Sequence, residues 1–240
     1  MKRRNLLAGG IAAATLAAIG PAAAQDASFS ATVLKVEADM NARRAAGQAV
    51  TADWLVESLG EMDARSKRVA AFELVRRVPY KLSSWTGDPE SLFNTGRGDC
   101  RHKEAAERRL LNRMGERATH VQVLFDWADL PIPREMLDNL TDTRGFHDTV
   151  ELVVDGVSII VDPTWDPALA AAGFPILPAW DGVSPTAPVT NGSLTVIRPG
   201  DVPNGANLYE HFGIRWPVRE RTLAFNRAFN AWTDTFRQQS

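Results

Sequence analysis

The sequence predicts an α+β protein in which a central helix packs on an antiparallel β-sheet and further helices flank this core. Two β-rich runs, residues 146–154 and 157–165, enclose Asp155-Gly156, a dipeptide that favours a two-residue hairpin turn. Residues 100–114 have the length of a helix and end at Gly115, a residue typical of helix C-termini. Apolar residues recur at helical spacing near both ends of the chain, at Val33, Val36 and Met40 and at Leu223, Phe225, Phe229 and Trp232.

The first residues have the order of an export signal. Lys2, Arg3 and Arg4 precede an uncharged run rich in Ala, Leu and Gly, which ends in small residues before Gln25. This order predicts a signal peptide over residues 1–24, and the adjacent arginines favour the twin-arginine type. A membrane helix is the alternative. We therefore expect a periplasmic or secreted protein without stable membrane insertion after cleavage of the signal.

The composition limits the classes of partner. The chain has 240 residues with 27 Lys and Arg against 29 Asp and Glu, a formal net charge of -2 with the two signs scattered. We expect neither a nucleic-acid surface nor an anionic-membrane surface from this balance. The single cysteine excludes a disulfide within one chain. The oligomeric state is left open by the sequence.

The chain divides into three parts after the signal. Residues 25–75 predict two helices with a break near Gly47, and residues 76–170 hold the core. Within that core we expect a loop to Asp99, a helix capped by Asp99, a strand near residues 118–127 and the hairpin. In residues 171–240, a stretch rich in Pro and Gly (173–206) is expected to wrap the surface or form a lid. A C-terminal helix over residues 218–237 then docks on the body.

Cys100 stands at the predicted start of the central helix. The unpaired N–H groups and the macrodipole of a helix N-terminus favour a thiolate, and Arg101 and Lys103 add positive charge. These features are typical of a nucleophile. The alternative is that Cys100 is a small buried hydrophobic residue.

The hairpin register provides a base for this nucleophile. If Asp155-Gly156 is a two-residue turn, Val154 pairs with Val157, and His147 and Asp162 then share one face of the sheet as diagonal neighbours. Asp148 projects to the opposite face, which carries the apolar residues Val150, Leu152, Val154, Val157, Ile159 and Val161. Asp166 has the correct parity and is the reserve partner for His147.

The other histidines and two tryptophans have weaker claims. We expect His102 on the surface and His120 as a satisfied core histidine, and no motif surrounds His211. Trp165 and Trp180 either line a cleft or serve packing. Cys100 and the histidines lack the spacing of metal ligands, so we expect no metal and no cofactor.

Three blocks together resemble a known family. Gly-Asp-Cys at a helix start, an aromatic-His-x-x-Val-Glu strand and a strand ending in Val-Asp-Pro-Thr are similar to the transglutaminase-like branch of the papain-like cysteine enzymes, in the same order. The resemblance covers residues of about 75–170. It implies a papain/transglutaminase-like core with Cys100 as nucleophile, His147 as general base and acid, and Asp162 as the group that orients the imidazole.

The same resemblance implies the chemistry. An exported cysteine hydrolase or acyltransferase would act on an amide of a peptide or protein through a thioester, with water or an amine as acceptor. The oxyanion hole would use the Cys100 backbone N–H and a side chain, Asn94 or Trp85. Arg101-His102-Lys103 departs from the acidic or small residue that often follows the family's cysteine. The alternative function is a non-catalytic module that binds a peptide or a cell-wall component.

Overall fold

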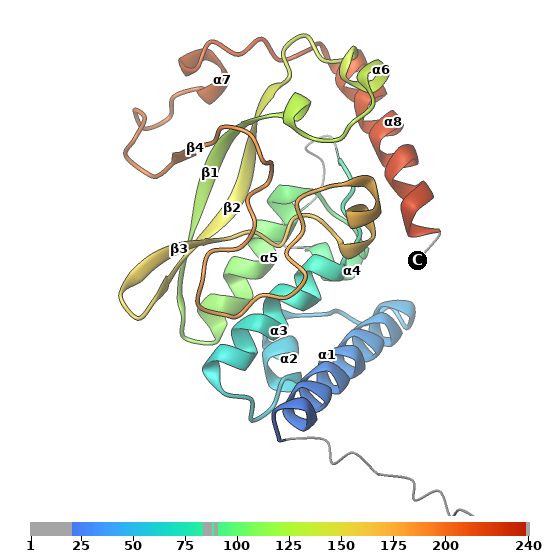
Figure 1. The fold of residues 1–240 in the computed structure, drawn as a ribbon, viewed down its shortest axis with the longest axis vertical. Helices are drawn as coiled ribbons and strands as arrows, with labels where there is room; N and C mark the ends of the chain where they lie inside the picture. The colour runs from blue at the N-terminus through green and yellow to red at the C-terminus, as the bar shows by residue number, and fades with distance from the viewer. Residues whose placement is uncertain (1–20, 84–87, 89–90, 239–240) are drawn as a thin grey trace, which may run out of the picture.

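The computed structural model describes residues 21–83, 88 and 91–238 and shows an α+β fold with a curled, four-stranded antiparallel sheet (Figure 1). The order of the strands in the sheet is β3-β2-β1-β4. They are β1 (Arg117–Asp126), β2 (Arg144–Val154), β3 (Val157–Val161) and β4 (Thr195–Ile197). β4 lies within the stretch that the sequence predicted as a surface loop or lid. Its three residues form a strand there because they pair with Gln122, Val123 and Leu124 of β1.

The hairpin has the predicted register. Val154 pairs with Val157 and Val150 pairs with Val161, so the two-residue turn is confirmed. Both turn residues have positive φ, 50° at Asp155 and 81° at Gly156, a conformation that Asp and Gly accept more readily than other residues. The predicted apolar face is buried except for Val157, which is 62% exposed beside the turn.

The N-terminal region forms three helices where the sequence predicted two. They are α1 (Pro21–Ala45), α2 (Ala52–Ser58) and α3 (Ala64–Arg77). The additional break follows Gly60, whose φ is 61°, and Asp63 then caps α3 by accepting a hydrogen bond from the Ser66 N–H. α1 begins inside the segment expected to be removed with the signal, and residues 1–20 lie outside the described residues.

The central helix α5 (Cys100–Arg113) packs against β1 and β2 on one side and against α2 and α3 on the other. Its predicted bounds are confirmed to within a residue. The short helix α4 (Leu92–Thr95) precedes it in a segment that the sequence predicted as loop. Asp99 occupies the N-cap position, but its side chain makes no capping hydrogen bond and turns to Ser83 and His102 instead.

The C-terminal helix α8 (Arg219–Arg237) docks on the body as predicted (Figure 1). The Asn230 side chain accepts from the Leu82 N–H and donates to the Leu82 carbonyl, and Arg237 pairs with Asp166. Three short segments lie at the same end of the molecule as α8, namely η2 (Trp127–Asp129), α6 (Arg134–Leu137) and α7 (Leu208–His211). The short helix η3 (Pro167–Ala172) contacts α8.

The buried apolar residues form three clusters with different neighbours. One joins α1, α2, α3 and α5, a second lies between α5 and the β2-β3 hairpin, and a third is largely aromatic and lies under α8. The aromatic cluster is built on Tyr80, Phe125, Trp127, Trp165, Phe225 and Phe229, and Cys100 packs against it. The N-terminus of α5 therefore reaches the most aromatic part of the interior.

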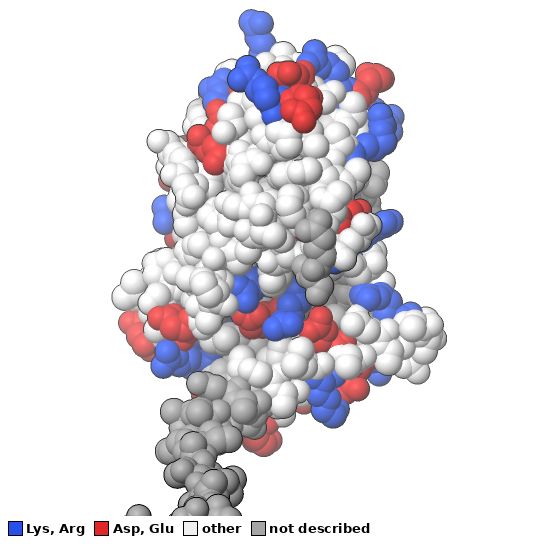
Figure 2. All heavy atoms as spheres, turned by 45° about the vertical axis from the view of Figure 1, so that its right-hand side comes forward, with Lys and Arg blue, Asp and Glu red and all other residues white. Residues whose placement is uncertain are grey.

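The surface mixes the two charges. On the face shown in Figure 2, basic and acidic side chains lie intermixed wherever they gather. Within the described residues, none of the helices has both the length and the apolar character needed to span a bilayer.

Candidate active site

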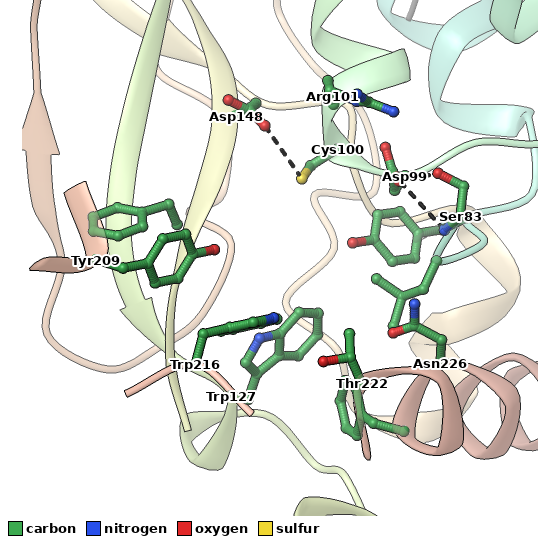
Figure 3. A pocket seen from close by; sticks show the side chains of 14 residues that line it. Ser83, Asp99, Cys100, Arg101, Trp127, Asp148, Tyr209, Trp216, Thr222 and Asn226 are labelled. Carbon is green, nitrogen blue, oxygen red and sulfur yellow. Dashed lines mark hydrogen bonds between the residues drawn. The ribbon is translucent and has the colours of Figure 1, made fainter. Parts of the chain in front are cut away.

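Cys100 is the first residue of α5 and lines a pocket at the helix N-terminus (Figure 3). The side chain is partly exposed and has no disulfide partner. The backbone just before Cys100 is held by an isolated parallel bridge between Tyr80 and Gly98. In this bridge the Lys81 N–H donates to the Gly98 carbonyl at 2.8 Å. Local sequence thus places the thiol at a defined point in the pocket.

The pocket walls are mainly aromatic and come from segments far apart in the sequence (Figure 3). Tyr80 and Trp127 line it from the core, and Tyr209, Trp216 and Phe225 line it from the C-terminal part of the chain. Its volume is about 70 Å³, which holds a few water molecules or the end of one narrow chain. The predicted catalytic residues all lie between residues 100 and 162. Residues after 206 therefore complete the wall of the pocket around Cys100.

His147 and Asp162 form the predicted hydrogen bond. His147 Nε2 lies 2.7 Å from Asp162 Oδ2, and the imidazole is 2% exposed. Asp162 Oδ1 accepts from the Thr164 N–H, so both carboxylate oxygens have a partner, and the Asp162 backbone N–H donates to Thr186 Oγ1. In a neutral imidazole, a carboxylate that accepts from Nε2 selects the tautomer with the proton on Nε2 and the lone pair on Nδ1. This is the tautomer that a general base requires.

The thiol does not bond to this pair. Cys100 Sγ lies 3.9 Å from Asp148 Oδ2, and within the described part of the chain its hydrogen-bonding partners do not include His147. Asp148 and His147 leave β2 on opposite faces, as predicted. Cys100 nevertheless packs against the aromatic cluster that contains Phe125, whose ring centroid is 6.1 Å from that of His147. The structure thus brings together His147 and Asp162, two of the three predicted residues. The thiol is turned toward Asp148, a carboxylate outside the predicted triad.

The surroundings of Cys100 oppose a thiolate. Burial, followed by the carboxylates of Asp148 and Asp99, raises the pKa of the Cys100 thiol well above its ordinary value, and the Asp148 backbone N–H offsets this only in part. This arrangement therefore does not favour the thiolate that the sequence predicted at the helix terminus. The helix N-terminus is present, but the carboxylates of Asp148 and Asp99 raise the pKa of the thiol, and neither Arg101 nor Lys103 is among the main groups that act on it. Lys103 is fully buried and donates to the Arg76 and Pro163 carbonyls.

Asp148 has two further partners on β1. His120 Nε2 lies 2.8 Å from Asp148 Oδ1, and Gln122 Nε2 donates to the same oxygen at 3.1 Å. The His120 side chain is 43% exposed, so the expectation of a core histidine is wrong. The hydrogen bond to Asp148 raises the pKa of His120. Sequence parity had placed Asp148 on the face of Val150 and Leu152; because α5 covers that face, the same parity could have indicated a contact with Cys100.

His102 also differs from its prediction. It is buried, not on the surface, and its Nδ1 lies 2.7 Å from Asp99 Oδ1. Asp99 Oδ2 accepts from the Ser83 hydroxyl, and these bonds lower the pKa of Asp99 against the effect of burial. His102 is three residues after Asp99, and this spacing places the two side chains on the same side of the helix start. The prediction considered only the spacing between His102 and Cys100.

The two oxyanion candidates fare differently. Asn94 accepts from the Val50 N–H at 2.8 Å and donates to the Val50 carbonyl, so it anchors a loop and does not line the pocket. Trp85 lies outside the described residues. Tyr80, which the sequence did not single out, lines the pocket, and burial together with Cys100 raises its pKa well above the ordinary value. A phenol that keeps its proton beside the sulfur is a suitable second donor.

The remaining predicted residues serve the fold. Asp166, the reserve partner of His147, binds Arg237 and the Tyr80 N–H. Trp165 and Trp180 are buried and donate to the Val189 and Ser184 carbonyls, which supports packing. His211 is exposed on α7, outside the pocket. Among the described residues, no group of His, Cys, Asp and Glu has the arrangement of a metal site.

Fold and site together define an α+β protein with one cysteine at a helix N-terminus, in a pocket with aromatic walls, and with a buried histidine–aspartate pair that does not line this pocket. No family model matches the chain, and no curated protein matches it.

Proposed function

We propose that the protein is a cysteine hydrolase or acyltransferase that acts on an amide bond through Cys100, His147 and Asp162. The observation that carries this proposal is the hydrogen bond of 2.7 Å between His147 Nε2 and Asp162 Oδ2, buried next to the aromatic cluster on which the Cys100 thiol packs. Such a pair orients an imidazole and leaves its other nitrogen available as a base.

The reaction would proceed in two acyl-transfer steps. His147 Nδ1 takes the thiol proton as Sγ attacks the amide carbonyl carbon, and the same proton passes to the leaving nitrogen as the C–N bond breaks. The product of this step is a thioester on Cys100. Water then gives a proton to Nδ1 and attacks the thioester, which releases a carboxylic acid and restores the thiol. An amine in place of water would give a new amide.

This mechanism requires the sulfur to leave Asp148. In the structure Sγ is turned to Asp148 Oδ2, so the reaction requires the Cys100 side chain to leave this contact and approach His147. The Cys100 N–H at the first turn of α5 and the Tyr80 hydroxyl are the donors that would stabilise the oxyanion.

The order of the three sequence blocks supports a papain/transglutaminase-like core, and the basic, apolar and small-residue order of residues 1–24 supports export to the periplasm or beyond. A peptide or protein amide is the proposed substrate, because the narrow pocket at the thiol suits the end of one side chain or backbone segment. No cofactor is needed for these steps.

One observation favours a second function. The thiol is paired with a carboxylate and not with the imidazole, an arrangement that suits a module which binds a peptide or cell-wall component without turnover. Binding that survives Cys100→Ala unchanged, without turnover by the parent, would support this alternative.

Acylation by a small ester tests the proposal without knowledge of the substrate. p-Nitrophenyl acetate should leave one acetyl group on Cys100, detected by mass spectrometry of the intact protein, and Cys100→Ala should remain unmodified. His147→Ala should slow acylation at least about 100-fold, the usual scale of general-base catalysis. His211→Ala, which changes an exposed histidine outside the pocket, is the matched control. Equal rates for the parent and His147→Ala would overturn the proposal.

A further inference from the structure

Asp148 stands between two cavities. On one side it lines the pocket of Cys100; on the other its partner His120 lines a surface groove of about 600 Å³ formed with the loop of residues 197–208. The path between them consists of two contacts, Cys100 Sγ to Asp148 Oδ2 at 3.9 Å and Asp148 Oδ1 to His120 Nε2 at 2.8 Å. A chain of polar groups thus joins the thiol to solvent.

The position of Asp148 is unusual for a carboxylate. The residue is 8% exposed and shares its face of β2 with Val150 and Leu152, both fully buried. Its oxygens are held by His120 and Gln122 from the neighbouring strand, and Gln122 is directly opposite Asp148 in the register. Burial of a charge on an apolar face is costly unless the charge is paired, so the pairing with His120 is what makes this position tolerable.

We propose that Asp148 and His120 form a relay that controls Cys100: Asp148 holds the protonated thiol away from His147, and His120 sets the strength of that hold from the groove. The inference rests on the proposed function in one respect, namely that Cys100 is the nucleophile. Asp148 touches the reacting sulfur directly. His120 acts through Asp148 and is a positioning residue.

The relay follows from charge. A carboxylate beside a thiol disfavours the thiolate, and a protonated imidazole on the far side of the carboxylate weakens this effect. Other titratable or charged groups also act on Cys100, Asp148 or His120, and they come from α5, α7 and the loops packed around them: Asp99, Glu104, Arg108, Tyr80, Asp162 and Tyr209. Asp148, unlike these groups, is a carboxylate that accepts a hydrogen bond from the sulfur. Its removal should therefore change the reactivity of the thiol most.

Alkylation of the single cysteine measures the relay directly. The rate of modification by iodoacetamide is followed from pH 5 to pH 10 in the parent, Asp148→Asn, His120→Gln and the double variant. Asp148→Asn should move the midpoint of the profile down by at least about one pH unit, which increases the thiolate fraction at neutral pH about tenfold. His120→Gln keeps a hydrogen-bond donor but loses the positive charge, so alkylation should be slower than in the parent at the acidic end of the range, where His120 is protonated, and should approach the parent rate as His120 loses its proton at higher pH.

The double variant separates a relay from two independent effects. If His120 acts through Asp148, the double variant should give the profile of Asp148→Asn alone. Glu151→Gln is the matched control, because it removes another carboxylate of β2, one that binds Arg198 and lies away from the thiol. Circular dichroism confirms that each variant is folded, and His120→Gln changes an exposed side chain, so one informative variant is available even if Asp148→Asn unfolds.

Two results would overturn the relay: an unchanged profile in Asp148→Asn, or an effect of His120→Gln that persists in full without Asp148. His147→Ala in the Asp148→Asn background distinguishes this inference from the proposed function. If Asp148→Asn shifts the profile but His147→Ala then leaves acylation by p-nitrophenyl acetate unchanged, the relay stands and the catalytic role of His147 falls.

Discussion

Arg237, in the last turn of α8, donates to Asp166 Oδ2 at 2.7 Å and to the Tyr80 carbonyl at 2.9 Å. Asp166 in turn accepts from the Tyr80 N–H at 2.9 Å. The C-terminal helix is thereby tied to a residue that lines the Cys100 pocket, and the same helix contributes Phe225 and Asn226 to the lining of this pocket. The end of the chain holds the site in shape.

Loss of this pair should loosen both helix and pocket. Arg237→Ala leaves the buried Asp166 carboxylate without the guanidinium that donates to both of its oxygens, and we expect the free energy of unfolding to fall by about 3 kcal/mol. Urea unfolding followed by circular dichroism measures this. Asp234→Asn removes the more exposed partner of the same arginine and should cost under about 1 kcal/mol. Equal effects of the two variants would contradict a structural role for the buried pair.

Glu107 predicts a loss of stability as pH rises. Its side chain is fully buried on α5, and neither oxygen has a hydrogen-bond partner among the described residues. Burial, with a smaller effect from Glu73, raises its pKa well above 4.5. A group with a raised pKa in the folded state stabilises the fold fully below its unfolded pKa. That contribution is lost as pH rises from 4.5 toward the folded value.

Glu107→Met should remove this dependence. The variant should be more stable than the parent at pH 7, by about 1–3 kcal/mol, because the two unpaired oxygens of Glu107 are no longer buried. Glu104→Gln changes a neighbouring carboxylate that is paired with Arg108, and it should not bring this gain. Urea unfolding at pH 4, 5.5 and 7 gives the comparison. A parent that is equally stable at these three pH values would count against a neutral Glu107.

Lys103 should act in the opposite sense and in another range. Burial lowers its pKa from 10.5 to about 7, while the ammonium donates to the Arg76 and Pro163 carbonyls. For a lysine with a depressed folded pKa, stability is complete above 10.5 and declines as pH falls toward 7. Lys103→Met should therefore flatten the stability profile between pH 7 and pH 10. Lys81→Met, at a lysine without full burial, should leave the slope in place.

The sequence predicted the elements that depend on local pattern. Asp155-Gly156 set the hairpin register, and that register placed His147 beside Asp162, as confirmed by their hydrogen bond. The helix that begins at Cys100 was also predicted from local pattern, since Asp99 precedes its first residue and Gly115 follows its end. Periodicity of two and of 3.6 residues is sufficient for such features.

The environment of the thiol depends on contacts between distant segments, and the sequence did not predict it. Asp148 meets Cys100 because α5 crosses β2 at that point, and His120 joins them through the pairing of β1 with β2. Neither contact has a signature within one segment. The aromatic wall from Tyr209 and Trp216 likewise arises from a loop path that no periodicity encodes.

The proposed export route has a direct test. Replacement of Arg3 and Arg4 by Lys keeps the charge but removes the guanidinium pair that the twin-arginine pathway recognises. We expect the double variant to accumulate as precursor in the cytoplasm, detected by fractionation and immunoblotting. The control is replacement of Lys2 by Arg, which leaves the pair intact. Normal export of the double variant would indicate a general secretory signal instead.

Gly98 should be sensitive to the smallest substitution. A Cβ at this position would lie 2.5 Å from His102 Cβ and 2.8 Å from Leu92 Cδ1, and the Gly98 backbone bonds to Pro79 and Lys81. Gly98→Ala must therefore shift the start of α5, and Cys100 with it. We expect a lower melting temperature. We also expect a change of at least about threefold in the rate at which iodoacetamide modifies Cys100, because a shift of the thiol changes the distance of 3.9 Å between Sγ and Asp148 Oδ2.

Gly115→Ala is the comparison at the other end of the same helix. Gly115 has a φ of 83° with open space around its Cα, so alanine there costs about 1 kcal/mol of conformational strain without a steric clash. This variant should also melt at a lower temperature but keep the alkylation rate of the parent. If both variants alter the rate alike, the rate follows general stability; if only Gly98→Ala does, the backbone before Cys100 positions the thiol.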